Sequence, residues 1–222
     1  MWKSVCYKEW LKIRWFLAGF TLLGVLGVGY LILTVQHGIA FSSGRNFWYN
    51  ILFMRLQYYG WLKYIPLLGG IGIAVAQYFP ETVSKRIKLV FHLPVGENKI
   101  IMMMHAFGTA CLLVSFLLIL GLFAGLSRIY LPSEMVYDTV VSVYPWFLAG
   151  LTAYFLVALV VLEPVWKYRV LYSVTGGLFL PVYLMSAPTA AYGTVNGLLT
   201  VFSVSLSVAL LFSACRFRKG EM

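Results

Sequence analysis

The chain has 222 residues, of which 61% are hydrophobic and 11% are charged, whereas an ordinary soluble domain carries about 25% charged residues. This composition, with a mean hydropathy of +0.86, excludes a water-soluble globular domain and indicates an integral membrane protein. The net charge of +10 does not indicate nucleic-acid binding, because the basic residues are grouped at the ends of apolar segments. The short alternating segments of a transmembrane barrel do not occur, so the spans are expected to be helical.

Residues 1–14 have the pattern of an amphipathic helix that lies in the membrane interface. One face carries Trp10 and Ile13, and Lys8 and Lys12 lie roughly opposite. The apolar run that follows is too long for the core of a typical signal sequence, so we take it as an uncleaved first helix. The chain is therefore expected to run along the surface before it turns into the bilayer.

Six apolar segments are long enough to predict membrane-spanning helices, since about 20 apolar residues cross the hydrocarbon core as a helix. They cover residues of about 15–35, 58–79, 100–125, 143–163, 170–188 and 192–215. No soluble domain or linker separates them. The predicted fold is an all-α polytopic membrane protein with six transmembrane helices, in a single domain over residues 1–222.

The outer segments are expected to be only partly regular. Residues 36–46 are rich in glycine and serine and predict a turn-rich loop. The aromatic residues of 47–64 predict an outer interfacial helix leading into the second span, because aromatic side chains concentrate at the level of the headgroups. The loop between the third and fourth spans contains Glu134 and Asp138 and is expected to form a short re-entrant or interfacial helix.

The distribution of lysine and arginine predicts the orientation. These residues flank the spans on one side of the membrane with four exceptions, which are Arg45, Arg55, Lys63 and Arg128. Basic residues accumulate on the cytoplasmic side of a membrane. Both termini and residues 80–99 are therefore expected in the cytoplasm, and the chain is expected to be a multi-pass protein of the cell (inner) membrane.

The loop between the second and third spans is the main charged island of the sequence. Read at 100° per residue, its charged and apolar side chains form two opposite stripes. The stripes consist of Glu81, Lys85, Lys88 and His92 on one side and Val83, Ile87, Val90 and Phe91 on the other. This pattern predicts an amphipathic helix at 81–93, lying at the membrane surface, that offers a binding site to a cytoplasmic partner.

The motifs of common catalytic sites are absent from the sequence. No lysine follows a glycine, so the chain has no phosphate-binding P-loop, and the motifs H-E-x-x-H and G-x-S-x-G do not occur. The three cysteines show no metal-binding spacing. His37, His92 and His105 fall in separate parts of the predicted topology. We therefore expect no enzymatic activity, metal or cofactor in this chain.

Glu163 is the acidic residue at the edge of a predicted span, and an ionisable group at that depth is a functional candidate. It lies at the cytoplasmic end of the fourth span, four residues before Lys167. A structural ion pair between Glu163 and Lys167 is favoured over a role in proton transfer, because proton-coupled transporters bury several such groups near the membrane centre.

The combination of six spans, a basic interfacial N-terminal helix and a basic helix between spans two and three resembles the permease subunits of ABC-2 type transporters. The string E-T-V-S-K-R-I-K-L-V-F-H-L-P-V, from Glu81 to Val95, is similar to the coupling region of that family. This chain lacks the Gly-Thr pair that many members carry and has Lys85 and Arg86 nearby instead.

The resemblance implies that the helix at 81–93 is a coupling helix that docks on a separate ATP-binding cassette ATPase. The residues it would bring to the ATPase are Glu81, Val83, Lys85, Arg86, Ile87 and Phe91. ATP and Mg²⁺ would be bound by that partner, and two permease subunits, identical or different, would form the pathway. The cargo implied is a lipid, peptide, heme or drug-like molecule that is exported. The alternative is a non-transporting membrane scaffold or assembly factor, which needs no ATPase.

The glycines of the first two spans have two interpretations. Small residues let helix backbones approach closely in lipid. Gly69, Gly70 and Gly72 of the second span are therefore expected to lie mostly at contacts within the chain. The alternative is a contact with the second permease subunit.

Overall fold

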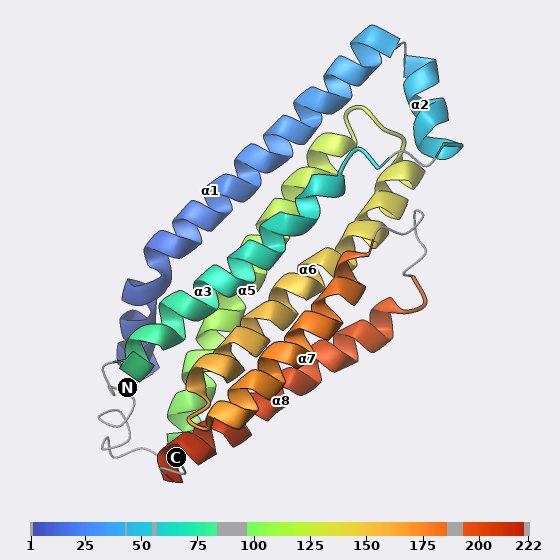
Figure 1. The fold of residues 1–222 in the computed structure, drawn as a ribbon. Coiled ribbons are helices and arrows are strands. Elements are labelled where there is room, and N and C mark those ends of the chain that lie inside the picture. The colour runs from blue at the N-terminus through green and yellow to red at the C-terminus, as the bar shows by residue number, and fades with distance from the viewer. Residues whose placement is uncertain (1, 43, 55–56, 84–96, 186–192, 220–222) are drawn as a thin grey trace.

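The computed structural model describes residues 2–42, 44–54, 57–83, 97–185 and 193–219, and every regular element within these ranges is helical. The elements in chain order are α1 (Trp2–Ser42), α2 (Gly44–Leu52), the short 3₁₀ helix η1 (Gly60–Lys63), α3 (Tyr64–Val83), α5 (Glu97–Ser127), α6 (Ser133–Leu162), α7 (Trp166–Leu184) and α8 (Asn196–Lys219). Figure 1 shows the long helices side by side in one bundle, with the start of α1 and the end of α8 at the same end.

Four helices in the described part of the chain are long and apolar enough to cross a membrane. They are Lys3–Phe41, Gly60–Val83, Lys99–Ser127 and Ser133–Leu162. The chain is thus an all-helical, multi-pass membrane protein. The sequence predicted six spans, and the last two, which correspond to α7 and α8, are not among these four. The apolar stretch of α8 extends over Asn196–Ala209.

The central helix of the bundle is α6, which packs against α3, α7 and α8, while α1 packs against α3 and α5. The backbones of α3 and α6 approach each other closely. A Cβ on Gly70 would collide with the carbonyl oxygen of Gly150, and a Cβ on Gly150 would collide with the carbonyl oxygen of Pro66. The backbones of the two helices are therefore in direct contact, as expected where glycines meet between helices in a membrane protein.

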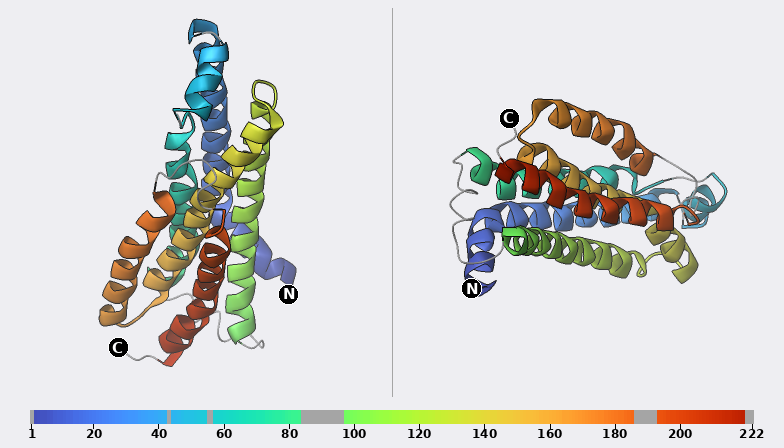
Figure 2. Two further views of the ribbon diagram at one scale, coloured as in Figure 1. Left: turned by 90° about the vertical axis from the view of Figure 1, so that its right-hand side faces the viewer. Right: turned by 90° about the horizontal axis from the view of Figure 1, so that it is seen from below.

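The first helix is much longer than a single span. Its 41 residues correspond to about 60 Å, whereas the hydrocarbon core of a bilayer is about 30 Å thick. At least one end of α1 must therefore extend beyond the hydrocarbon. Figure 2 shows the first turns of α1 at an angle to the rest of the helix. That these turns lie along the membrane surface, as the pattern of residues 1–14 predicts, stays a prediction.

The prediction of a turn-rich loop at 36–46 is wrong, because α1 continues through Ser42 and α2 begins at Gly44. The reason is packing between the two helices. A Cβ on Gly38 would lie 2.7 Å from Cε2 of Phe47, so glycine serves here to bring α1 against the ring rather than to form a turn. Phe47 and Val35 belong to one buried apolar cluster.

Two further boundaries differ from the sequence prediction. The helix expected between the third and fourth spans is the first part of α6, which begins at Ser133 and is one helix through Leu162. Buried Val136 and Val143 continue its apolar face across the expected break. Likewise, Glu81 and Val83, which were expected to open a separate surface helix, form the last turn of α3, and Pro80 lies inside that helix.

Candidate functional site

A cluster of four charged side chains joins the first turns of α1 to the last turn of α3. Nζ of Lys12 lies 2.6 Å from Oε1 of Glu9 and 2.9 Å from Oε1 of Glu81. Nζ of Lys8 lies 2.7 Å from the same Glu81 oxygen. Lys12 lies four residues after Lys8 and three after Glu9, and residues with these spacings lie on one face of a helix. We call Lys8, Glu9, Lys12 and Glu81 the charge cluster.

The carboxylates of the charge cluster are buried, and its lysines are more exposed. Glu9 and Glu81 are 0% and 1% exposed, whereas the side chains of Lys12 and Lys8 are 15% and 42% exposed. A buried carboxylate is costly unless a cation and hydrogen bonds compensate it. The positive charges of two lysines balance the negative charges of two carboxylates, so the charge cluster has no net charge. Lys12 is the lysine that contacts both carboxylates.

From the charge cluster, hydrogen bonds lead into the bundle through Gln77 of α3. Lys12 Nζ donates to the carbonyl oxygen of Gln77 at 3.4 Å. The Gln77 side chain then connects two more helices, because Nε2 donates to the carbonyl oxygen of Met104 in α5 at 2.7 Å and Oε1 accepts from the hydroxyl of Tyr154 in α6 at 2.7 Å. Both ends of this buried amide are thus paired.

The chain of polar contacts continues to α8. The Tyr78 hydroxyl lies 3.4 Å from the Tyr154 hydroxyl and 3.2 Å from Nδ1 of His105. Nε2 of His105 shares a hydrogen bond of 2.8 Å with Oγ of Ser207. We call Gln77, Tyr78, His105, Tyr154 and Ser207 the buried polar chain. It connects α3, α5, α6 and α8, and Lys12 joins α1 to it.

Gly108 of α5 makes room for this arrangement. A Cβ at that position would collide with Oε1 of Gln77 and with the hydroxyl of Tyr154. Any larger residue would push the amide and the phenol apart. The glycine therefore serves a close approach between polar side chains of α3 and α6.

Polar groups inside a membrane protein are expensive unless they are paired, and for that reason they mark functional positions. The buried polar chain joins α3, α5, α6 and α8, and Lys12 links it to α1 and to the charge cluster at one end of the bundle. Among the described residues, no group of three or more histidine, cysteine, aspartate or glutamate side chains could hold a metal ion. Because the hydrogen bonds of the buried polar chain run between helices, a shift of α1 or α3 would strain the contacts of α5, α6 and α8.

The residues predicted to contact an ATPase are only partly described. Glu81 is buried in the charge cluster, and its described partners are Lys8 and Lys12, which are distant in sequence. Val83 is 64% exposed at the end of α3. Lys85, Arg86, Ile87 and Phe91 lie outside the described residues, as does most of the predicted helix at 81–93.

Glu163 and Lys167 lie at the connection from α6 to α7. Glu163 is buried and caps the end of α6, and its carbonyl oxygen accepts a hydrogen bond of 2.7 Å from Nε of Arg169. Lys167 is exposed in the first turn of α7. The ion pair of Glu163 with Lys167 stays a prediction, and the local contact shown is the one with Arg169.

The sequence patterns did not indicate that Gln77, Tyr78, His105 and Tyr154 form a group. The available signal was the presence of an amide and an imidazole inside or next to apolar runs, where polar groups need partners. Periodicity could not reveal that they converge, because they lie on three different helices. Glu9 was not singled out from the sequence either, and its partner Lys12 lies one turn further along the same helix.

We expect Tyr154→Phe to lower the free energy of unfolding by about 1 to 2 kcal/mol, because the substitution leaves the buried Oε1 of Gln77 without its hydroxyl donor. The measurement is unfolding by a denaturing detergent in mixed micelles. Tyr144→Phe is the matched control in the same helix. The hydroxyl of Tyr144 shares an exposed hydrogen bond of 3.3 Å with Oγ1 of Thr200, and its loss should change stability by less than about 0.5 kcal/mol. Equal stability of the two variants would contradict a structural role for the buried polar chain.

Comparisons of the chain with protein-family models, curated proteins and solved structures found no match.

Proposed function

We propose that this chain is the membrane-spanning permease subunit of an ATP-binding cassette exporter, of the kind that the ABC-2 type permeases represent. The observation that carries the proposal is the ion pairing of Lys8 and Lys12 with Glu81. Glu81 is the first residue of the segment that the sequence predicts to dock on an ATPase. The pairing therefore fastens the basic N-terminal turns of α1 to the point where a partner would act.

The geometry supports a route for motion from that point into the membrane. A displacement of residues 81–93 would pull on the end of α3 and, through the charge cluster, on α1. Gln77 lies one turn before Glu81 and bonds to α5 and α6. A partner that prefers one arrangement of this segment could thus bias the bundle between two states, which is how ATP-driven subunits act on a permease. ATP and Mg²⁺ would be bound and hydrolysed by that partner.

We propose that the chain crosses the membrane six times, and that α7 and α8 are the fifth and sixth spans. An even number of spans puts both ends of the chain on one side of the membrane, and the start of α1 and the end of α8 lie at one end of the bundle (Figure 1). The basic residues are concentrated at the same ends of the spans, so we assign that side to the cytoplasm of a cell membrane.

Cysteine labelling tests this orientation. In a cysteine-free background, Lys88→Cys should react with a membrane-impermeant maleimide only after the cells are opened. Asn46→Cys, in α2 at the other end of the bundle, should react in intact cells. Labelling of position 88 from outside would overturn the six-span topology.

Pathways of this kind require two permease subunits, so a second copy or a related chain is part of the proposal. The cargo class remains lipid, peptide, heme or drug-like, as the resemblance implies. A scaffold or assembly factor would not need an ATPase, and binding to one is therefore the decisive property.

We expect Ile87→Asp to weaken co-purification with a cognate ATP-binding subunit by roughly tenfold or more, because a buried apolar anchor at an interface typically contributes about 2 kcal/mol or more. The measurement is recovery of the ATPase with the tagged permease, together with its ATP hydrolysis. Ile129→Asp, the same substitution at an exposed site in the turn between α5 and α6, controls for general damage to the protein.

Membrane insertion of both variants should be unchanged. If Ile87→Asp retains the ATPase as well as wild type does, the docking site is not at 81–93. If the wild-type chain recovers no ATPase from its native membranes, the scaffold function is favoured instead.

A further inference from the structure

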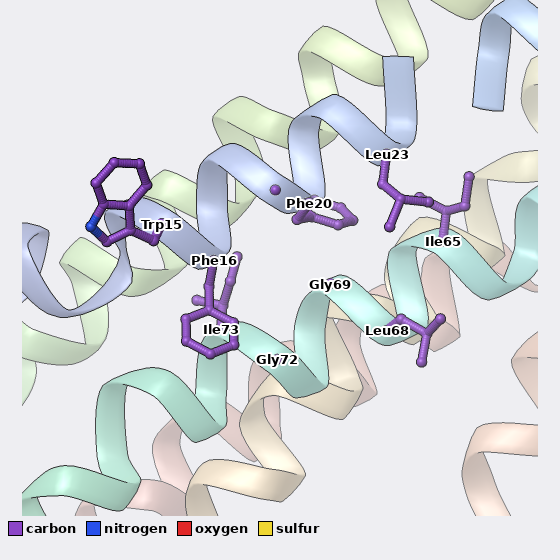
Figure 3. Close-up of a pocket in the computed structure, with 10 residues that line it drawn as sticks. Trp15, Phe16, Phe20, Leu23, Ile65, Leu68, Gly69, Gly72 and Ile73 are labelled. Atoms are coloured by element: carbon purple, nitrogen blue, oxygen red, sulfur yellow. The ribbon is translucent and has the colours of Figure 1, made fainter. Parts of the chain in front are cut away.

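Two grooves flank α1 at the level of Trp15, which lines both. The first lies between α1 and α3 and has a volume of about 350 Å³ (Figure 3). Its lining is apolar throughout, from Trp15 and Phe16 at one end to Leu23 and Ile65 at the other. It offers nothing that would recognise a charged group.

The second groove lies between α1 and α5, has a volume of about 540 Å³ and differs in having a cation. Its α1 side is formed by Trp10, Arg14, Trp15, Leu17, Ala18 and Thr21, and its α5 side by Val114, Ser115 and Leu118. Arg14 and the two tryptophans lie toward the start of α1, and apolar side chains follow along the helix. We call this surface the α1/α5 groove.

The walls of the α1/α5 groove present carbon rather than free polar groups. Thr21 Oγ1 donates to the carbonyl oxygen of Leu17 at 2.8 Å, and Ser115 Oγ donates to that of Cys111 at 3.1 Å. Both hydroxyls are thus satisfied within their own helices. The groove below Arg14 is therefore suited to a hydrocarbon chain and not to a polar ligand.

Arg14 is exposed at the mouth of the groove, and its guanidinium lies 5.4 Å from the centroid of the Trp15 ring. The ion pairs of the described residues do not include it. Guanidinium binds phosphate through paired hydrogen bonds, and tryptophan favours the level of the headgroups. A guanidinium that has no ion pair with the described residues, two tryptophans and an apolar groove thus occur in the order of the parts of a phospholipid.

We propose that the α1/α5 groove binds an anionic phospholipid, with its phosphate on Arg14 and one acyl chain between α1 and α5. A negatively charged headgroup is favoured over a zwitterionic one because no carboxylate among the described residues neutralises Arg14. This site does not depend on a transport function, since a bilayer lipid would occupy it in any membrane role of the chain.

Native mass spectrometry of the purified full chain, titrated with equal amounts of phosphatidylglycerol and phosphatidylcholine, tests the site. The ratio of the two adducts is measured within one sample, so it does not depend on the yield of a variant. Wild type should retain phosphatidylglycerol preferentially. Arg14→Gln should reduce that preference by roughly fivefold, because this is the change in affinity that one basic residue near an anionic headgroup typically causes. Arg128→Gln, an exposed arginine outside the groove, should leave it unchanged.

Two bulky substitutions separate the two grooves. Ala18→Phe fills the α1/α5 groove and should lower phosphatidylglycerol retention, while Gly19→Phe fills the α1/α3 groove and should not. The proposal is overturned if Arg14→Gln keeps the wild-type preference, or if Ala18→Phe reduces retention no more than Gly19→Phe does.

Discussion

Lys12→Met is expected to lower the free energy of unfolding by about 3 to 5 kcal/mol, the range for removing one partner of a buried ion pair. Lys12 is the cation that contacts both buried carboxylates, Glu9 at 2.6 Å and Glu81 at 2.9 Å. Methionine keeps most of the side-chain volume, so the loss reports on charge rather than on packing. Denaturing-detergent titration at neutral pH measures the effect.

Lys8→Met is the matched control, because Lys8 lies in the same cluster and contacts the same Glu81 oxygen but is 42% exposed. Solvent-exposed ion pairs contribute about 0 to 1 kcal/mol, so this variant should remain close to wild type. Adding Glu9→Gln to Lys12→Met should recover part of the loss, since it removes one uncompensated buried charge. A Lys8→Met variant that is as unstable as Lys12→Met would argue against this division of roles.

Gly70→Ala is expected to destabilise the protein by about 3 kcal/mol, at the upper end of the range for overpacking. The new Cβ would meet the carbonyl oxygen of Gly150, which is backbone of the central helix α6 and cannot rotate away as a side chain could. The helices would have to separate, and the bonds of Gln77 to α5 and α6, two turns along α3, would be strained as a result.

Gly72→Ala provides the comparison within the same helix. No atom lies within 4 Å of a Cβ built on Gly72, so this variant should be as stable as wild type or gain about 0.5 to 1 kcal/mol from the better helix former. Thermal melting in detergent would rank the two variants. Similar melting temperatures for Gly70→Ala and Gly72→Ala would contradict backbone contact between α3 and α6.

Several properties could be read from the sequence because they depend on short stretches of chain. The span predicted at 100–125 corresponds to α5, Glu97–Ser127, since an apolar run of this length has to satisfy its backbone groups as a helix. The same reasoning identified the region of α3. It did not establish how many helices cross the membrane, because length and apolar composition single out four of the six predicted spans among the described helices.

The candidate site was predictable only in part. Glu81 was singled out from the sequence, but as one of the residues of a separate surface helix that would contact an ATPase. The described structure joins it to Lys12, which lies 69 residues away along the chain. The convergence of Gln77, His105 and Tyr154 was missed for the same reason, since each contributes a single polar group to a different helix.

The sequence by itself determined the class of this protein, the helical state of its apolar runs and the positions of most of those helices, because local hydropathy and backbone hydrogen bonding decide these features. Only the tertiary structure decided which helices touch and which polar groups meet. Gly38 and Gly70 illustrate the difference. From the sequence, either glycine could indicate a turn or a weak point in a helix. In the structure, a Cβ on Gly38 would collide with the ring of Phe47, and a Cβ on Gly70 would collide with the backbone of Gly150. Such contacts depend on the relative position of whole helices, and no local pattern contains that information.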